Sequence, residues 1–93
     1  MLRANRAGFL ARMGRGEEAL RESEAALAAM ERMQRADDNE YAQALEAKAF
    51  ALQAVGRTAE ARATQERAIA RYEALFGAEH REAQRARGNL DKL

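Results

Sequence analysis

The sequence contains no cysteine and no proline, and only six of its 93 residues are glycine. The lack of cysteine excludes disulfides, zinc sites with thiolate ligands and cysteine nucleophiles. Val, Ile and Thr are rare, and no stretch alternates apolar with polar residues, so strands are not expected. The abundant residues are Ala, Glu, Arg, Leu and Gln, which are all good helix formers. The sequence therefore predicts an all-α fold.

Charge of one sign and long apolar runs are also missing. The chain has 16 basic and 15 acidic residues, mixed along its length, and a net charge of +1. This balance is typical of a solvated surface and predicts no nucleic-acid partner. No apolar run has the length of a membrane-spanning helix, and no signal peptide stands at the start. We therefore expect one soluble, cytoplasmic domain over residues 1–93, without a membrane partner.

A repeat becomes visible when the sequence is shifted against itself by 42 residues. The pair Gly14-Arg15 then falls on Gly56-Arg57, and Glu18-Ala19 falls on Glu60-Ala61. Further matches join Ala7 to Ala49, Leu10 to Leu52, Glu24 to Glu66, Ala26-Leu27 to Ala68-Ile69 and Glu31 to Glu73. A truncated third copy starts near Ala78, which falls on Ala36. A period of this length indicates a stacked array of helical units.

Each period contains two helices. The spacing of apolar residues, together with glycines and polar breaks, predicts five helices in all, at about 2–13, 17–34, 40–54, 58–76 and 79 to the end. Gly14, Gly56 and Gly77 are placed to end helices, because glycine adopts the left-handed conformation common there. One of Asp37, Asp38 and Asn39 should cap the third helix and Thr58 the fourth.

Residues that could carry out chemistry are few and isolated. His80 is the only histidine and stands at an expected helix start, without the partners that a metal site or a general base requires. The adjacent acids Glu17-Glu18 and Asp37-Asp38 also lie at helix starts, where acidic side chains suit the helix dipole. We expect no enzyme activity, no metal site and no cofactor.

The repeat resembles the tetratricopeptide repeat, in the 42-residue variety found in kinesin light chains and many bacterial proteins. The resemblance rests on Asn5, Ala7, Leu10, Gly14-Arg15, Glu18-Ala19, Glu24 and Ala26-Leu27, and on Gly56-Arg57 and Glu66-Arg67-Ala68-Ile69. The segment 77–83 is similar to the family's Gly-x-x-His-Pro junction, with Arg81 in place of Pro. Arg6 and Lys48 stand where the family usually has Leu, and Gly16 and Thr58 replace an aromatic residue.

The resemblance implies a right-handed array of antiparallel helical hairpins that forms a solenoid. Repeat one would cover residues 1–35, repeat two residues 40–77 and a partial third repeat residues 78–93. In this family the first helix of each hairpin lines a concave groove. The residues that would line it here are Asn5, Gly8, Arg12, Gln43, Glu46, Phe50, Gln53, Arg85 and Asn89.

Particular roles follow from the resemblance for some groove residues. Asn5 and Asn89 match the asparagines that hydrogen-bond the backbone of an extended peptide, whereas the middle repeat has Ala47 there. Arg12 and Arg85 are the nearest candidates for binding a terminal carboxylate. Phe50 is either an exposed anchor for a ligand or a side chain that packs between hairpins.

The resemblance implies a non-catalytic scaffold that binds a peptide, a partner protein or another domain of its parent protein in the groove. One alternative is a structural or self-assembly module, in which the last helix with Leu90 and Leu93 packs against another copy. Another is a sensor segment of a larger bacterial regulator or enzyme.

Overall fold

A computed structural model describes residues 15–35 and 38–93 of the chain. Within these ranges there are four helices and no strand: α2 (Gly16–Arg32), α3 (Asn39–Ala54), α4 (Thr58–Phe76) and α5 (Arg81–Leu90). The all-α prediction is confirmed for this part of the chain. The structure gives four helices rather than five, because the first expected helix, at 2–13, lies outside the described residues.

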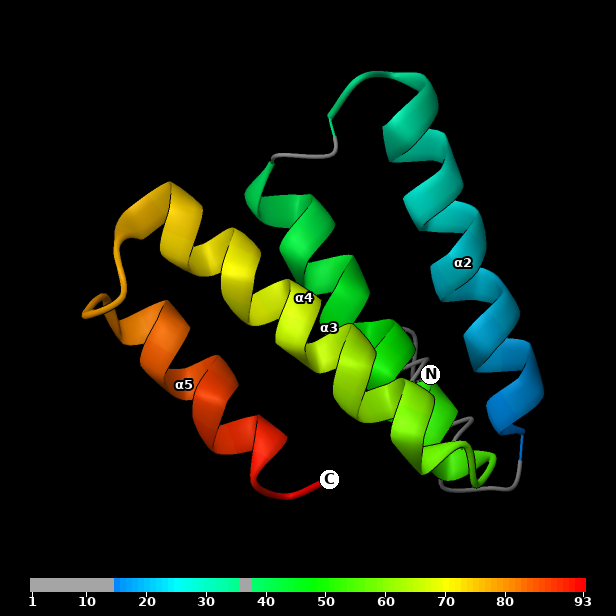
Figure 1. Ribbon diagram of the computed structural model, residues 1–93. Coiled ribbons are helices and arrows are strands. Elements are labelled where there is room, and N and C mark those ends of the chain that lie inside the picture. Colours follow the sequence, from blue (N-terminus) through cyan, green and yellow to red (C-terminus); the bar gives the residue numbers. More distant parts are fainter. Residues whose placement is uncertain (1–14, 36–37) are drawn as a thin grey trace, which may run out of the picture.

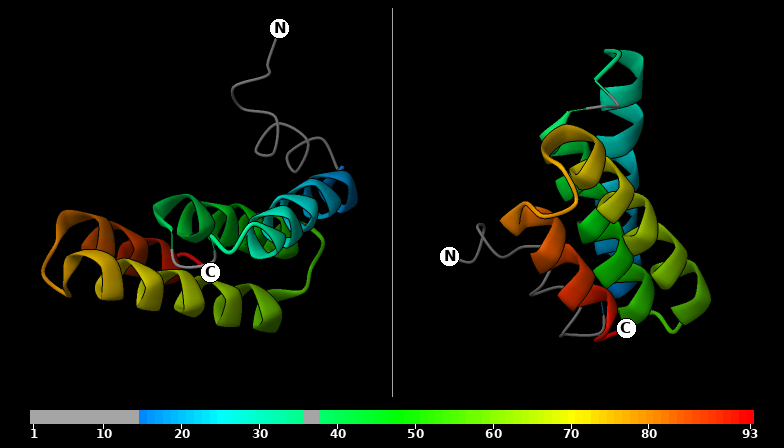
Figure 2. Two further views of the ribbon diagram at one scale, coloured as in Figure 1. Left: turned by 90° about the horizontal axis from the view of Figure 1, so that it is seen from above. Right: turned by 60° about the vertical axis from the view of Figure 1, so that its left-hand side comes forward.

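The helices form an antiparallel series in which α3 has the central place. It packs against both α2 and α4, and α4 also packs against α5 (Figure 1). The two views in Figure 2 show the same order, with α5 beside α4 and α2 on the other side of α3. α2 and α4 diverge from each other, so α3 remains partly uncovered between them.

Two apolar clusters hold the helices together. The larger one contains residues from all four described helices: Leu27, Tyr41, Ala42, Leu45, Ala68, Ile69, Tyr72, Ala83 and Ala86. The smaller cluster joins the start of α2 to the end of α3 and the start of α4, through Ala19, Leu20, Ala51, Leu52 and Ala61. More than half of the buried apolar residues are alanines, which lets neighbouring helix backbones approach closely.

Gly16 lies where α2 comes close to the end of α3. A Cβ atom at this position would lie 2.6 Å from Val55 Cγ1 and 3.2 Å from the Cβ atom of Ala54. An added methyl group would therefore overlap the end of α3. This contact leaves no room for the aromatic residue usual in the repeat, and α2 begins at Gly16, one residue before the predicted start.

α2 and α3 end in the same backbone arrangement. At the end of α3, Gly56 has a φ of +86°, and the Arg57 amide donates to the Leu52 carbonyl at 2.9 Å. At the end of α2, Gln34 takes the left-handed position with a φ of +60°, and the Arg35 amide donates to the Met30 carbonyl at 2.8 Å. These are Schellman motifs, which satisfy the last helix carbonyls.

The helix starts bear out one predicted cap and correct another. Asp38 accepts a hydrogen bond from the Glu40 amide at 3.1 Å and is the N-cap of α3, as predicted. Thr58 is not the N-cap of α4. Only Arg57 separates the left-handed Gly56 from α4, so Thr58 already has helical geometry and the cap position falls to Arg57, which makes no side-chain capping bond.

His80 has a structural role at the start of α5. Its Nδ1 atom accepts a hydrogen bond from the Glu82 amide at 3.1 Å, which makes it the N-cap of the helix. Its ring also stacks on Phe76, with 4.6 Å between the ring centroids. The side chain therefore joins the end of α4 to the start of α5.

Candidate functional site

The structure places six of the groove candidates on two helices. Gln43, Glu46, Phe50 and Gln53 lie on α3, and Arg85 and Asn89 lie on α5. Asn5, Gly8 and Arg12 lie outside the described residues, so their predicted place in a groove stays a prediction. The six described side chains fall into two groups, one exposed on α3 and one bonded between helices.

The exposed group lies on a strip of α3, which we call the α3 stripe. It consists of Gln43, Ala47, Phe50 and Ala54, which share one helix face because they are spaced by three or four positions. The Phe50 side chain is 47% exposed. Among the described residues, neither Phe50 nor Gln43 has a hydrogen bond or a ring contact with another side chain. Phe50 and Gln43 are therefore exposed side chains of the α3 stripe that could contact a partner.

The bonded group surrounds Glu46, which is only 6% exposed. The Glu46 carboxylate accepts hydrogen bonds from Gln65 Nε2 at 2.7 Å, Tyr72 Oη at 3.0 Å, Arg85 Nη2 at 2.9 Å and Asn89 Nδ2 at 3.3 Å. We call these five residues the Glu46 network. Because Glu46 belongs to α3, Gln65 and Tyr72 to α4, and Arg85 and Asn89 to α5, the network connects three helices.

The Glu46 network keeps its carboxylate ionised. Burial alone would raise the pKa of Glu46, but the hydrogen bonds from Arg85 and Gln65 and the charge of Arg85 outweigh it, so the pKa lies below its usual value. Burial and the neighbouring Glu46 charge raise the pKa of Tyr72 to about 12. The hydrogen bond to Glu46 likewise raises the pKa of Arg85.

This network changes the roles of three predicted groove residues. Glu46 does not present its carboxylate to a partner, since five donor atoms of the protein surround it. Arg85 and Asn89 already donate hydrogen bonds to Glu46, so these donors are not available to a peptide. Gln53 donates to the Lys92 carbonyl at 3.3 Å. The sequence carried a signal of this role, because Glu46 follows Ala42 by four positions and precedes Ala49 by three, within the apolar face of α3.

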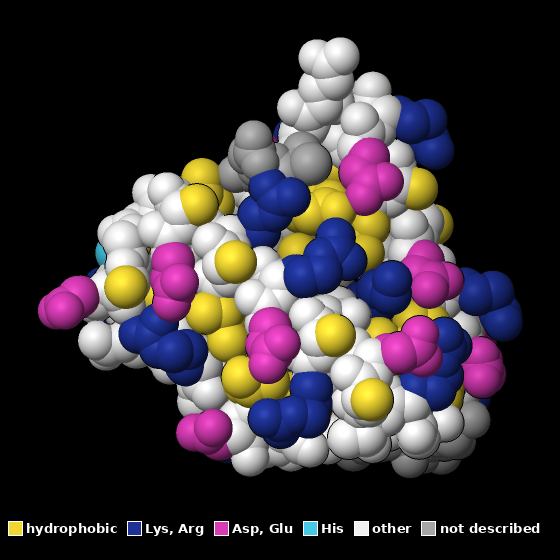
Figure 3. All heavy atoms as spheres, viewed as in Figure 1, with side chains coloured by type: hydrophobic (Ala, Val, Ile, Leu, Met, Phe, Trp, Pro, Cys, Tyr) yellow, Lys and Arg dark blue, Asp and Glu magenta, His cyan; other side chains and the backbone are white. Residues whose placement is uncertain are grey.

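A second feature, which residue spacing did not predict, is a cleft between α2 and α4 with α3 as its floor. Figure 3 shows hydrophobic side chains at the bottom of this gap, with Lys, Arg, Asp and Glu side chains around it. One hollow, of about 220 Å³, is lined by Glu24, Leu27, Ala28, Glu31, Tyr41, Lys48 and Arg67. A second, of about 280 Å³, shares Glu24, Lys48 and Arg67 and adds Leu52, Arg57, Glu60, Ala63 and Thr64. We call the two hollows together the α2–α4 cleft.

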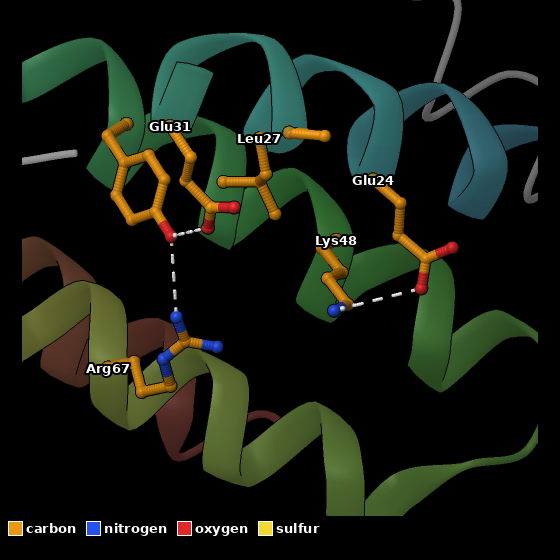
Figure 4. A pocket seen from close by; sticks show the side chains of 7 residues that line it. Glu24, Leu27, Glu31, Lys48 and Arg67 are labelled. Atoms are coloured by element: carbon orange, nitrogen blue, oxygen red, sulfur yellow. Dashed lines mark hydrogen bonds and ion pairs between the residues drawn. The ribbon is translucent and has the colours of Figure 1, made fainter. Parts of the chain in front are cut away.

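Two of the charged side chains of the α2–α4 cleft, Lys48 and Arg67, are only loosely paired (Figure 4). Lys48 Nζ lies 3.7 Å from Glu24 Oε2, and Arg67 Nη2 lies 3.4 Å from the Tyr41 hydroxyl. The Tyr41 hydroxyl donates to Glu31 at 2.7 Å. Lys48 was the available signal in the sequence, since it stands where the repeat usually has Leu.

The described helices contain no arrangement suited to metal binding or membrane insertion. No three His, Cys, Asp or Glu side chains in residues 15–35 and 38–93 come together as metal ligands. Over the same residues, every helix is too short or too polar to cross a lipid bilayer.

Comparisons with known proteins agree with the repeat found in the sequence. A family profile described as tetratricopeptide repeat matches residues 1–74, which is most of the chain. No curated protein and no solved structure matched the sequence. The match spans the region in which the 42-residue offset aligns the two repeats, and the helical hairpins α2–α3 and α3–α4 agree with it. The chain belongs to the tetratricopeptide repeat family.

Proposed function

We propose that the chain is a non-catalytic protein-interaction module and that its partner contacts the α3 stripe. Members of the tetratricopeptide repeat family generally bind proteins or peptides. The exposure of Phe50 is the main observation in favour of α3 as the surface that a partner contacts. The two tyrosines, Tyr41 and Tyr72, are 2% and 0% exposed, whereas the Phe50 ring is nearly half exposed.

Exposed aromatic rings that lack an internal contact are common anchors in protein interfaces. They bury a large apolar area against a partner at a small cost in conformational entropy. Gln43 lies two helical turns before Phe50 on the same face and offers one acceptor and two donors. This combination suits a partner that places an apolar side chain beside Phe50 and its own polar groups near Gln43.

The partner would lie along the concave side of a right-handed solenoid of the 42-residue variety. In that arrangement α3 and α5 would be the first helices of consecutive repeats, and the helix predicted at about 2–13 would supply a preceding first helix with Asn5 and Arg12. The Glu46 network supports this geometry by holding α5 beside α3. The Arg85 side chain is 44% exposed, but its Nε, Nη1 and Nη2 atoms already donate to Glu82 and Glu46.

A peptide selection would test this proposal. Peptides from a displayed random library are selected on the whole chain, and their dissociation constants are measured for the original protein and for Phe50→Ala. We expect the substitution to weaken binding at least tenfold, because it removes a central aromatic contact. Phe76→Ala is the matched control, since Phe76 is 41% exposed but lies at the far end of α4. Equal affinity of the original protein and Phe50→Ala would remove the α3 stripe from the proposal.

A second candidate function is self-assembly. Its contact between copies is better formed by Leu75 and Phe76 than by Leu90 and Leu93. Leu90 and Leu93 pack back onto the larger and the smaller apolar cluster, so neither is fully available to another copy. The adjacent Leu75 and Phe76 are 40% and 41% exposed. If these two form a contact between copies, light scattering will show a dimer that Leu75→Glu converts to a monomer. A monomer at every concentration would refute self-assembly.

A further inference from the structure

We propose that the α2–α4 cleft is a second binding surface, which takes an acidic side chain of a partner protein between Lys48 and Arg67. This surface is separate from the α3 stripe. Lys48 and Phe50 are two positions apart on α3, and two residues of an α-helix turn through about 200°. A ligand on one surface therefore leaves the other accessible.

The two hollows of the cleft meet at the proposed anion position. Glu24, Lys48 and Arg67 line both of them, so these side chains lie where one hollow passes into the other. Figure 4 shows Lys48 extending from α3 and Arg67 from α4 into the space beside α2. A carboxylate at the junction would be within reach of an ammonium group and a guanidinium group from different helices.

The bonds already present leave these two cations with unused donors. Arg57 pairs with Glu60 at 2.5 Å and Arg87 with Glu73 at 2.5 Å, whereas Arg67 has no carboxylate partner among the described residues. Its one hydrogen bond is the 3.4 Å contact with Tyr41. A guanidinium group has five N–H donors, and a carboxylate is the group that matches its geometry best.

The charges around the junction favour an anion over a cation. Three acids and three bases line the whole cleft, and Glu60 is paired with Arg57. Glu24 Oε2 lies 3.7 Å from Lys48 Nζ, and the charge of Lys48 also acts on Glu60. The charged side chains that line both hollows are two cations, Lys48 and Arg67, and one carboxylate, Glu24. The Lys48 side chain is only 23% exposed, so its charge is less screened there than on an open surface.

The floor of the cleft adds a preference for a protein ligand. Leu27 and Ala28 line the first hollow, and Leu52 and Ala63 line the second. A small inorganic anion would make no use of these apolar walls, whereas a peptide can bury an aliphatic side chain next to its acidic residue. Two cations are too few for the phosphate backbone of a nucleic acid. The fitting ligand is a segment with Glu or Asp beside an aliphatic residue.

The test is a pair of short peptides that differ in one charge. Acetyl-Leu-Glu-Leu-amide and acetyl-Leu-Gln-Leu-amide are titrated into the whole chain, and backbone and side-chain NMR signals are followed. We expect the Glu peptide to shift the signals of Leu27, Lys48 and Arg67, and to bind at least fivefold more tightly than the Gln peptide. Equal affinities, or shifts confined to the α3 stripe, would overturn the proposal. Equal shifts from sodium acetate would also overturn it, because they would show a general attraction of anions.

Substitutions of Lys48 and Arg67 test whether these two cations bind the peptide. Lys48→Gln and Arg67→Gln should each lower the affinity for the Glu peptide at least threefold. Arg21→Gln removes the same charge from the exposed face of α2, outside the cleft, and should leave the affinity unchanged. Phe50→Ala should also leave it unchanged, so failure at the α3 stripe and failure at the cleft give different results. Unaltered binding by both cleft variants would contradict the assignment.

Discussion

The Glu46 network differs from the junction of the α2–α4 cleft, where Lys48 and Arg67 lie, in how completely its charged side chains are paired. In the network, one buried carboxylate receives hydrogen bonds from four side chains, on α4 and α5. In the cleft, Lys48 and Arg67 have only contacts of 3.7 Å and 3.4 Å. A charged group that the protein has already saturated serves the fold, whereas one with unused donors can serve a partner. The difference separates structural charges from candidate binding charges within one helical array.

Removal of the central carboxylate should have the largest effect on stability. We expect Glu46→Ala to lower the free energy of unfolding by about 2–4 kcal/mol at neutral pH, because Arg85, Gln65 and Tyr72 lose their shared acceptor. Glu46→Gln should cost less, since the amide oxygen still accepts hydrogen bonds. Urea unfolding followed by circular dichroism measures both. A loss below about 0.5 kcal/mol for Glu46→Ala would show that the network does not hold the helices together.

Gly16 in α2 and Gly88 in α5 allow helix packing to be tested by adding one methyl group at each position. Gly16→Ala should destabilise the protein by about 1–3 kcal/mol, because its methyl group would overlap Val55. Gly88→Ala should stabilise it by about 0.5–1 kcal/mol, because α5 is helical there and nothing lies within 4 Å of the added carbon. Thermal unfolding of the two variants shows whether each substitution raises or lowers the stability. The same sign for both would contradict the packing of α2 against α3.

Acidification should lower the free energy of unfolding through the loss of the Glu46 charge, which distinguishes the network from other carboxylates. The pKa of Glu46 is lowered in the folded state, so its contribution is present above the unfolded value of about 4.3 and is lost as the pH falls through the folded value. The protein should therefore lose stability below about pH 4.3, and Glu46→Gln should lose less over the same range. Urea unfolding at pH 7 and pH 3 provides the comparison. Parallel losses in both proteins would assign the acid sensitivity to other carboxylates, among them Asp38.

The smallest effect on stability should come from the cleft. Lys48→Gln and Arg67→Gln should each change the free energy of unfolding by less than about 0.5 kcal/mol, because loosely paired charges contribute little. These variants are the counterpart of Glu46→Ala and are measured in the same urea series. A loss of 2 kcal/mol or more in either variant would place that cation among the structural charges and would erase the contrast between the two regions.

Much of the helical fold could be predicted from residue spacing. The 42-residue offset and the apolar periodicity gave α2, α3 and α4 to within about two residues at most ends, because helix punctuation is local. Gly56, Gly77 and Asp38 act at these ends as predicted. Thr58 was misplaced because the N-cap is fixed by the length of the preceding turn, and that turn uses Gly56 and Arg57 together.

The candidate site was less accessible to sequence reasoning, because it depends on contacts between helices. Spacing placed Glu46 on the same side of α3 as Phe50, but it did not show that α5 covers one and leaves the other exposed. The α2–α4 cleft depends on the divergence of two helices separated in sequence by α3. Lys48 was visible as an unusual residue, whereas Arg67 lay within a matching part of the repeat and carried no signal of its own.

The most direct test of the central distinction is one NMR titration that follows the side-chain Nε–Hε signals of Arg67 and Arg85 together. Acetyl-Leu-Glu-Leu-amide is added to the original protein, and both signals are recorded at each step. The account predicts that the Arg67 signal shifts with saturation, while the Arg85 signal stays in place because Glu46 already occupies that guanidinium group. A shift of Arg85 with Arg67 unchanged would contradict the account, because it would make the network the binding site and the cleft part of the inert surface.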